Sequence, residues 1–206
     1  MEFDAIVLAG GRSSRMGSAK SALMFEGRTL VELAVEASRL ARTIVVVGPD
    51  GVAPAGVLTA RESPALGGPA AALAAGVDTL DSLGGAPAAW LLVLACDLPR
   101  AGEAVPALLA AALPHTRREC DAVVAVDDSG RRQPLLALYR TDAIVRAAAS
   151  ARSNGDLAGL PLRRLVGGLD TVEVAVDGAL CADVDTPEQA RSFGIDVPRA
   201  EGAALI

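Results

Sequence analysis

Residues 5–20 read Ala-Ile-Val-Leu-Ala-Gly-Gly-Arg-Ser-Ser-Arg-Met-Gly-Ser-Ala-Lys, and the rest of the chain is best interpreted from this stretch. The apolar run 3–9 predicts a buried strand that leads directly into a glycine pair. Glycine lets the backbone approach a ligand closely, while arginine and lysine bring positive charge. The loop therefore predicts polyphosphate binding. The alternative is a solvated connection between a strand and a helix in which the basic residues are incidental.

Two common phosphate-binding patterns do not fit this loop. The Walker A pattern G-x-x-x-x-G-K-[ST] fails because Ser18 and Ala19 separate Gly17 from Lys20. The dinucleotide pattern G-x-G-x-x-G fails because Gly10 and Gly11 are adjacent. A P-loop NTPase and a dinucleotide-binding Rossmann protein are thus both disfavoured.

The composition narrows the class of protein. A chain of 206 residues predicts one domain, which we place at residues 1–193, followed by a flexible tail at 194–206 that is rich in Pro, Gly and Ala. Hydrophobic residues make up 51% of the chain and aromatic residues only 2%, so the core must consist of Ala, Val and Leu. The net charge of −6 argues against nucleic-acid or membrane partners.

Cysteine usage and apolar run length predict a cytoplasmic protein. The three cysteines, Cys96, Cys120 and Cys181, form no CxxC pair, which fits a reducing compartment better than a disulfide framework. The longest apolar run, near residues 86–96, is shorter than the roughly 20 residues that a membrane-spanning helix needs. The chain begins almost directly with a strand, and no signal peptide is recognised.

Strand and helix patterns alternate along the chain, which predicts a three-layer α/β/α sandwich around a mostly parallel, Rossmann-like sheet. Thr29 and Glu32 have the spacing of a capping box, which predicts a helix that runs to about Arg42. We expect strands at 3–9, 43–47, 57–59, 89–95, 121–126, 133–140 and 171–176, and the other helices at about 70–80, 101–113, 141–151 and 160–168 and after Thr186.

Two aspartates are candidate metal ligands. Asp97 follows the most apolar run, and open α/β sheets bind ligands at the carboxyl ends of their strands. This position favours metal binding over the alternative, in which Asp97 only caps the next helix. Asp185 precedes Thr186-Pro187, so it either leads into the last helix or supplies a second carboxylate.

The ordered string Leu8-Ala9-Gly10-Gly11-x-Ser13-x-Arg15-Met16-Gly17-x-x-Lys20 resembles the signature of the molybdenum cofactor guanylyltransferase (MobA-like) family of nucleotidyltransferases. Further segments of the chain resemble the family in the same order: Gly68-Pro69, Cys96-Asp97-Leu98-Pro99, Gln133-Pro134 and Asp183-Val184-Asp185-Thr186-Pro187. The resemblance extends from Leu8 to Glu188. It implies the nucleotide-diphospho-sugar transferase fold.

The resemblance implies a Mg²⁺-dependent transfer of GMP from GTP to the phosphate of molybdenum-molybdopterin, which forms the guanine dinucleotide cofactor and pyrophosphate. It also implies molybdoenzymes or cofactor-biosynthesis proteins as possible partners. The alternatives are a cytidylyltransferase that uses CTP and the same pterin, and a sugar-phosphate nucleotidyltransferase of the same fold. A nucleotide-binding regulatory protein without turnover is a further alternative, which Arg15, Lys20 and Asp97 disfavour.

The family also implies roles for individual residues. Arg15, Lys20 and Asp97 are the expected catalytic residues, with Arg15 and Lys20 neutralising the departing pyrophosphate, while Asp97 and Asp185 hold Mg²⁺. Gln133, Arg163 and Arg164 are candidates to contact the pterin, although a solvated helix face is the favoured interpretation of the two arginines. The expected nucleotide-binding residues are Leu8, Ala9, Gly10, Gly11, Arg12, Ser13, Lys20, Gly48, Glu62, Gly68 and Asp97.

Two further features bear on the chemistry. In the family, Leu-Ala-Gly-Gly accompanies the choice of guanine, so Gly10 favours GTP, with the base read near Gly48 and Glu62. A phosphate monoester has a second pKa of about 6 and is mostly dianionic at neutral pH. An acceptor of this kind needs no general base, which is consistent with a chain that contains one histidine.

Overall fold

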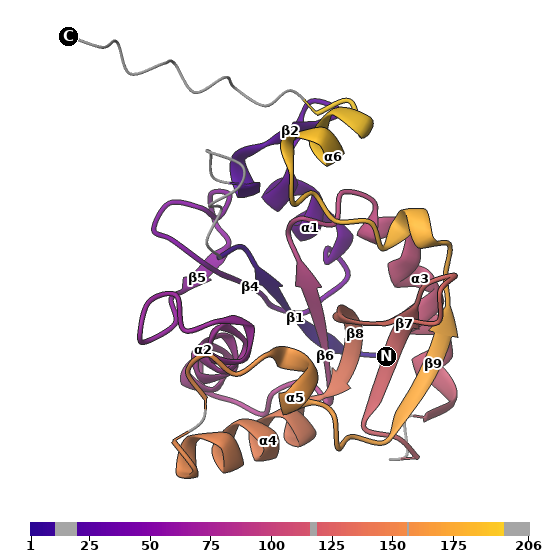
Figure 1. Cartoon of the computed structure of the whole chain (residues 1–206). Coiled ribbons are helices and arrows are strands. Elements are labelled where there is room, and N and C mark those ends of the chain that lie inside the picture. Colours follow the sequence, from indigo (N-terminus) through magenta and orange to yellow (C-terminus); the bar gives the residue numbers. More distant parts are fainter. Residues whose placement is uncertain (11–19, 116–118, 156, 196–206) are drawn as a thin grey trace, which may run out of the picture.

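The computed structural model of the chain describes residues 1–10, 20–115, 119–155 and 157–195 (Figure 1). Its centre is a seven-stranded sheet with the strand order β5-β4-β1-β6-β8-β7-β9. Neighbouring strands run parallel except at β8, which is antiparallel to β6 and to β7. In chain order the strands are β1 (Phe3–Leu8), β4 (Ile44–Val47), β5 (Leu58–Ala60), β6 (Trp90–Ala95), β7 (Ala122–Val126), β8 (Arg132–Arg140) and β9 (Thr171–Ala175).

Helices cover both faces of the sheet, which confirms the expected three-layer α/β/α arrangement (Figure 1). On one face α1 (Leu30–Ala37) packs against α3 (Ala101–Ala112). On the other face α2 (Pro69–Ser82) packs against α4 (Thr141–Ser153) and the short α5 (Leu162–Leu165). Short 3₁₀ turns are η1 (Lys20–Ala22), η2 (Leu113–His115) and η3 (Gly178–Leu180).

The core consists of small and branched aliphatic side chains, as the composition predicts. Every residue of β1 and of β6 is buried, so these two central strands are covered on both faces. A Cβ atom built on Gly76 of α2 would lie 2.7 Å from Cδ1 of Ile6 in β1. The absence of a side chain at Gly76 therefore lets α2 lie close against the centre of the sheet.

A small separate core lies beyond the carboxyl ends of the strands, where the two-stranded ribbon of β2 (Met24–Phe25) and β3 (Arg28–Thr29) meets α6 (Pro187–Ser192) (Figure 1). The sequence analysis did not predict this ribbon. The core contains Leu23, Leu30, Val184, Ala190 and Ile195. Packing thus continues past residue 193, where we expected the domain to end, because Ile195 is 1% exposed.

Helix α1 has the predicted capping box but ends at Ala37 instead of continuing to about Arg42. Tertiary contacts of Arg42 account for the difference. Its backbone N–H donates to the Phe3 carbonyl at 2.8 Å, and its guanidinium donates to both carboxylate oxygens of Asp4 at 3.1 and 2.9 Å. The chain must leave the helix early for Arg42 to reach the start of β1.

Candidate nucleotide and metal site

The site is expected where β1 and β6 lie side by side in the middle of the sheet. The chain leaves β1 towards β4 on one side, whereas it leaves β6 towards β7 and β8 on the other. Ligands of open α/β sheets bind in the crevice outside such a switch point. Leu8 pairs with Ala95 here, and Cys96 N–H donates to the Leu8 carbonyl at 3.0 Å. The segments that begin at Ala9 and at Cys96 therefore start next to each other.

Three residues that we expected to bind the base come together beside this point. A Cβ atom built on Gly10 would lie 3.8 Å from Oε1 of Glu62, 3.9 Å from its Oε2 and 3.8 Å from the Cα atom of Gly48. Backbone hydrogen bonds join the three segments, because Ala9 N–H donates to Val47 at 2.8 Å and Gly48 N–H donates to Ala60 at 3.0 Å. Gly10 thus faces the Glu62 carboxylate, and the backbone of Gly48 lies next to Gly10.

The carboxylate of Glu62 is buried, with the residue 9% exposed. Its Oε1 accepts a hydrogen bond from Leu66 N–H at 3.0 Å, and Oε2 accepts none from the residues that the structure describes. Burial of a carboxylate oxygen is costly unless it accepts hydrogen bonds. Glu62 is therefore suited to accept N–H groups from a ligand that lies against Gly10.

Three glycines around Glu62 are required by close packing or by a positive φ. A Cβ atom on Gly48 would lie 3.1 Å from the carbonyl carbon and oxygen of Ala9, so this position can offer only backbone. Gly68 precedes α2 with a φ of +87°, and a Cβ atom on Gly67 would lie 2.8 Å from the Pro64 carbonyl oxygen. The Glu62–Gly68 loop consequently holds the carboxylate and the N-terminus of α2 in fixed positions.

The second half of the site contains the two candidate metal ligands. Val184 N–H donates to the Asp97 carbonyl at 3.0 Å, and the Val184 side chain is fully buried in the small core with α6. Asp185 follows directly, and its N–H donates to Oε1 of Gln189 at 2.9 Å within the predicted cap of α6. The structure therefore brings Asp185 next to Asp97, although the two lie far apart in the sequence.

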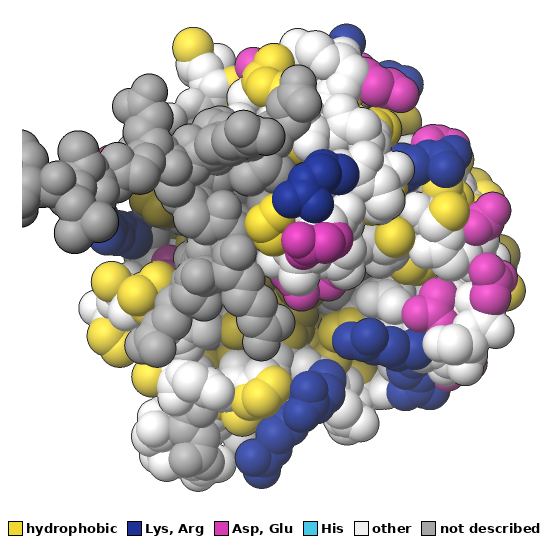
Figure 2. Space-filling model, turned by 45° about the horizontal axis from the view of Figure 1, so that its top comes forward, with side chains coloured by type: hydrophobic (Ala, Val, Ile, Leu, Met, Phe, Trp, Pro, Cys, Tyr) yellow, Lys and Arg dark blue, Asp and Glu magenta, His cyan; other side chains and the backbone are white. Residues whose placement is uncertain are grey.

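Two carboxylates suit Mg²⁺, which typically binds one or two protein carboxylates together with substrate phosphates and water. No group of three or more His, Cys, Asp or Glu side chains that could hold a metal occurs in the described parts of the chain. The donor set therefore fits a metal that is shared with a bound triphosphate better than a closed structural metal site. The surface on this side has a recess with a hydrophobic floor, and acidic and basic side chains line its rim (Figure 2).

The candidate pterin residues have different surroundings. Gln133 lies near the start of β8, at the end of the sheet where β6 ends. Its Nε2 donates to Oδ2 of Asp127 at 2.8 Å. Arg163 and Arg164 are exposed on α5, and neither side chain forms an ion pair with another residue that the structure describes. Gly159 N–H donates to the Gly67 carbonyl at 2.7 Å, so the loop before α5 lies beside the start of α2.

Several predicted residues lie outside the described part of the chain. These are Gly11, Arg12, Ser13 and Arg15, together with the side chain of Lys20, whose backbone begins η1. Sequence reasoning also missed residues that build the site. Neither Asp127 nor Val184 was assigned a role from the sequence. The available signal was the apolar valine between two aspartates, which indicates that the middle residue is buried.

Comparisons with known proteins address the family. The family model of the MobA-like NTP transferase domain matches residues 5–187. This chain belongs to the MobA-like NTP transferase family. A probable molybdenum cofactor guanylyltransferase of Bacillus cereus is 32% identical over 148 residues, which are 67% of this chain and 68% of the relative. One from Synechococcus elongatus is 31% identical over 151 residues, 68% of this chain and 73% of the relative. The family expected from the sequence is thereby confirmed.

Solved structures confirm the fold that is expected for a MobA-like chain. The molybdopterin-guanine dinucleotide biosynthesis protein A of Archaeoglobus fulgidus superposes with a TM-score of 0.65 at 21% identity, over 93% of this chain and 96% of the other. The 2-C-methyl-D-erythritol 4-phosphate cytidylyltransferase of Thermus thermophilus gives 0.66 at 22% identity, over 94% and 97%. A Mycobacterium tuberculosis protein in complex with manganese gives 0.62 at 17% identity, over 94% and 98%.

Proposed function

We propose that this protein transfers GMP from GTP to the phosphate of molybdenum-molybdopterin and releases pyrophosphate. Membership of the MobA-like family supports a nucleotidyl transfer, and the names of the relatives support the pterin acceptor. The observation that carries the choice of GTP is the Glu62 carboxylate, which faces Gly10. A buried carboxylate in this position suits guanine better than the other bases.

Guanine is the base whose Watson–Crick edge presents two adjacent donors, N1–H and the N2 amino group. An ionised carboxylate only accepts hydrogen bonds, so it can pair with both donors at once. Adenine, cytosine and uracil each place an acceptor beside their donor, which would face a carboxylate oxygen unfavourably. Gly10 has no side chain, which leaves the face of Glu62 next to it open to a flat ring.

In the proposed reaction, an oxygen of the acceptor phosphate attacks the α-phosphorus of GTP, and the bond from that phosphorus to the pyrophosphate oxygen breaks. Arg15 and Lys20 neutralise the leaving pyrophosphate, and Asp97 and Asp185 hold Mg²⁺. Bound Mg²⁺ supplies charge neutralisation at the phosphate oxygens. The acceptor phosphate is already mostly dianionic, with a second pKa of about 6, so no residue has to remove a proton.

The residues predicted to bind the nucleotide have three roles in this reaction. Leu8, Ala9 and Gly10 place backbone against the base and ribose, and Gly48 and Glu62 complete the base pocket. Gly68 positions the N-terminus of α2, where backbone N–H groups favour anions. Gly11, Arg12 and Ser13 wrap the phosphates. We assign the reaction to the cytoplasm, with molybdoenzymes or other cofactor-biosynthesis proteins as recipients of the product.

Calorimetry with Mg²⁺ and GTP, CTP, ATP or UTP tests the choice of nucleotide. We expect GTP to bind most tightly, and transfer of its labelled α-phosphate to molybdenum-molybdopterin should follow. A preference for CTP would instead support a cytidylyltransferase, the activity in the name of one protein of similar fold. Binding of none of the four nucleotides would contradict the role of the first loop.

A further inference from the structure

Strand β8 contains a bulge close to Asp97. Val124 of β7 pairs with Ala137, but the next residue, Ala125, pairs with Gln133, so residues 134–136 have no partner on β7. On its other edge β8 stays in regular register with β6 up to the pair of Leu94 and Leu136. The bulge therefore places Gln133 opposite Ala125, where unbroken pairing would put Leu136.

A buried hydroxyl holds this bulge from inside. Tyr139, the only tyrosine, is fully buried, and its hydroxyl donates to the Pro134 carbonyl at 2.8 Å. Without this hydrogen bond the buried Tyr139 hydroxyl would have no partner among the described residues, which is unfavourable. The backbone next to Gln133 is thus fixed by the core and does not depend on a surface turn alone.

The orientation of the Gln133 amide is set by Asp127. Oδ1 of Asp127 accepts from Ser129 N–H at 2.9 Å, from the Ser129 hydroxyl at 2.6 Å and from Arg131 N–H at 3.1 Å. These hydrogen bonds, above all that from the Ser129 side chain, lower the pKa of Asp127, so its carboxylate is ionised at neutral pH and only accepts. Gln133 must therefore turn its NH₂ group towards Oδ2, which accepts at 2.8 Å.

The rest of the amide remains available to a ligand. Among the described residues, Oε1 of Gln133 accepts no hydrogen bond, and Nε2 donates only to Asp127. Gln133 lies near the start of β8, and Asp97 follows β6. Because these neighbouring strands are antiparallel, both residues lie at the same end of the sheet. Glu62 follows β5, at the opposite side of the β1–β6 switch point. A nucleotide beside Glu62 and Gly10 would leave the Gln133 side for the acceptor.

The same turn is also joined to the segment that supplies Asp185. Oδ2 of Asp128 accepts from Gly178 N–H at 2.9 Å, at the start of η3, and the chain then continues to Val184 and Asp185. The turn after β7 therefore contacts both the start of β8 and the segment leading to the second candidate metal ligand. Asp127 and Asp128 divide these two contacts between them.

We propose that Asp127 is a positioning residue that fixes the amide of Gln133, and that Gln133 binds the pterin of the acceptor through Oε1 and an N–H group. This inference rests on the proposed function, because it takes the acceptor to be a pterin. A pterin ring presents a lactam N–H and carbonyl beside an amino group, and an amide with one free acceptor and one free donor is complementary to such an edge.

The variant Asp127→Asn tests the orientation with little change in shape. The introduced asparagine keeps an oxygen for Ser129 and Arg131 but presents NH₂ where Oδ2 was, which forces the Gln133 amide to turn over. We expect the KM for molybdenum-molybdopterin to rise about tenfold to a hundredfold, while the Kd for GTP stays unchanged. Asp128→Asn is the matched control, since it removes the same charge from the same turn without touching Gln133 and keeps a side-chain oxygen to accept from Gly178 N–H, so its KM should stay within about twofold of wild type.

The double variant Asp127→Asn, Gln133→Glu separates positioning from structure. Its asparagine amide can donate to the introduced glutamate carboxylate, so the pair is restored, but the group turned outward has lost its donor. We expect wild-type thermal stability together with a KM that is still raised. Recovery of a wild-type KM in the double variant would overturn the inference, as would a Kd for GTP that rises in parallel.

Failure of the inference and failure of the proposed function give different results. If the wild type transfers GMP to molybdenum-molybdopterin but Asp127→Asn has an unchanged KM for it, the inference is wrong and the proposed function stands. If the wild type binds GTP and never modifies molybdenum-molybdopterin, the proposed function is wrong, and the inference falls with it.

Discussion

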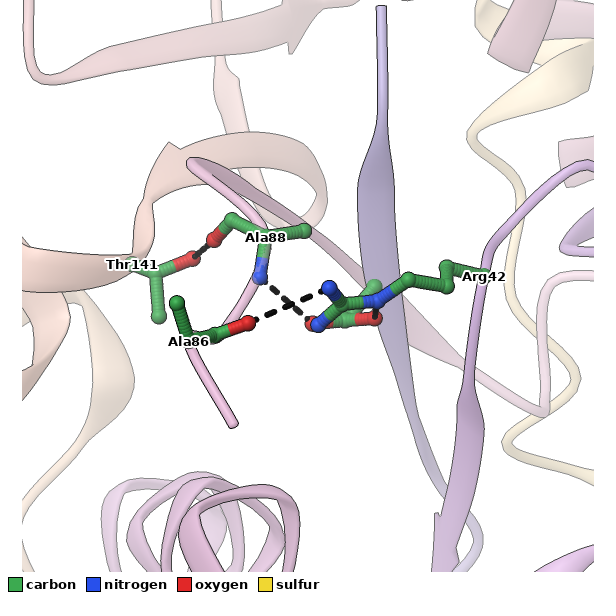
Figure 3. A network of polar contacts seen from close by, with 5 residues as sticks. Arg42, Ala86, Ala88 and Thr141 are labelled. Atoms are coloured by element: carbon green, nitrogen blue, oxygen red, sulfur yellow. Dashed lines mark hydrogen bonds and ion pairs between the residues drawn. The ribbon is translucent and has the colours of Figure 1, made fainter. Parts of the chain in front are cut away.

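Two buried carboxylates lie at opposite ends of the sheet and differ in how many hydrogen bonds they accept. Asp4, at the amino end of β1, is 1% exposed, and both of its carboxylate oxygens accept hydrogen bonds from the protein. Glu62, past the end of β5, is 9% exposed and accepts from one donor among the described residues. Oδ1 of Asp4 accepts from Nε of Arg42 at 3.1 Å, and Oδ2 accepts from Nη2 at 2.9 Å and from Ala88 N–H at 2.9 Å (Figure 3). Arg42 also donates to the Ala86 carbonyl at 3.1 Å, and the Thr141 hydroxyl donates to the Ala88 carbonyl at 2.6 Å.

The comparison distinguishes a carboxylate that stabilises the fold from one that is available to a ligand. At the amino end of β1, which we call the closed end, hydrogen bonds join β1, the segment after α1, the loop before β6 and the start of α4. At the open end, two glycines and the partly satisfied carboxylate of Glu62 lie beside the switch point of the sheet. We therefore expect substitutions at the closed end to change stability and those at the open end to change binding and turnover.

The largest effect should come from Asp97→Asn at the open end. Loss of a metal ligand should lower turnover on the order of 10³-fold, because charge neutralisation at the transferred phosphate is the main catalytic contribution in such reactions. Pyrophosphate release measures turnover, and thermal unfolding should show only a small change. Pyrophosphate release at the wild-type rate would contradict the proposed mechanism.

Asp4→Ala should give the next largest effect, and at the closed end it should act on stability. It leaves the buried Ala88 N–H and one side of Arg42 without partners, so we expect a loss of about 2–3 kcal/mol in the free energy of unfolding. Urea unfolding measures this loss. The control is Asp50→Ala, which breaks an exposed 3.6 Å pair with Arg61 and should cost less than about 1 kcal/mol. Equal losses in the two variants would erase the distinction between the sites.

Glu62→Gln should weaken GTP binding while the protein remains folded. The glutamine amide would place an NH₂ group against the N–H groups of guanine, which should raise the Kd for GTP about tenfold to a hundredfold in calorimetry. The control Glu36→Gln lies on the exposed side of α1 and should leave that Kd unchanged. An unchanged Kd for GTP in Glu62→Gln would remove the structural argument for guanine.

The smallest predicted effect concerns two buried cysteines near opposite ends of the sheet. Burial raises the pKa of Cys120, while the charge of Arg140 lowers it in part. Burial together with the negative charges of Asp127, Asp128 and Asp177 raises the pKa of Cys181 to about 11. Because these pKa values are raised in the folded state, each thiol contributes stability that is present below the unfolded pKa of about 8.5 and is lost as the pH rises towards the folded value.

Unfolding in urea between pH 8 and 10.5 should therefore show stability falling as the pH increases. Cys181→Ala should make this fall shallower, and Cys120→Ala should do so to a smaller extent. The cysteines form no disulfide within the described part of the chain, so no disulfide there complicates the measurement. A fall that is unaffected by Cys181→Ala would contradict the burial argument.

Local features of the fold could be predicted from the sequence, because each depends on neighbouring residues. The capping box at Thr29, the start of a helix at Thr186-Pro187 and the apolar runs that became β1 and β6 are of this kind. The length of α1 could not be predicted, since it depends on the bond from Arg42 to Asp4 across the sheet edge. Pairing registers are similarly non-local, so the pairing of Gln133 with Ala125 across the bulge in β8 could not be predicted, although a proline at position 134 is compatible with a bulge.

The candidate site shows the same division. Gly10, Gly48, Glu62, Asp97 and Asp185 were predicted. The structure brings the first three together, and a backbone hydrogen bond from Val184 joins the segment of Asp185 to Asp97. The roles of these residues stay predictions. The hydrogen bond from Gln133 to Asp127 was not foreseen, because it requires both the hairpin after β7 and the bulge that follows it.

The hydrogen bond from Val184 to Asp97 has a consequence for protein synthesis. Asp97 follows β6, whereas Asp185 follows β9, so β7, β8 and β9 must be synthesised before Asp185 can join Asp97. Domains generally fold as units during synthesis. We therefore expect a nascent chain that stops before Asp185 to lack the pair of carboxylates and to be catalytically silent.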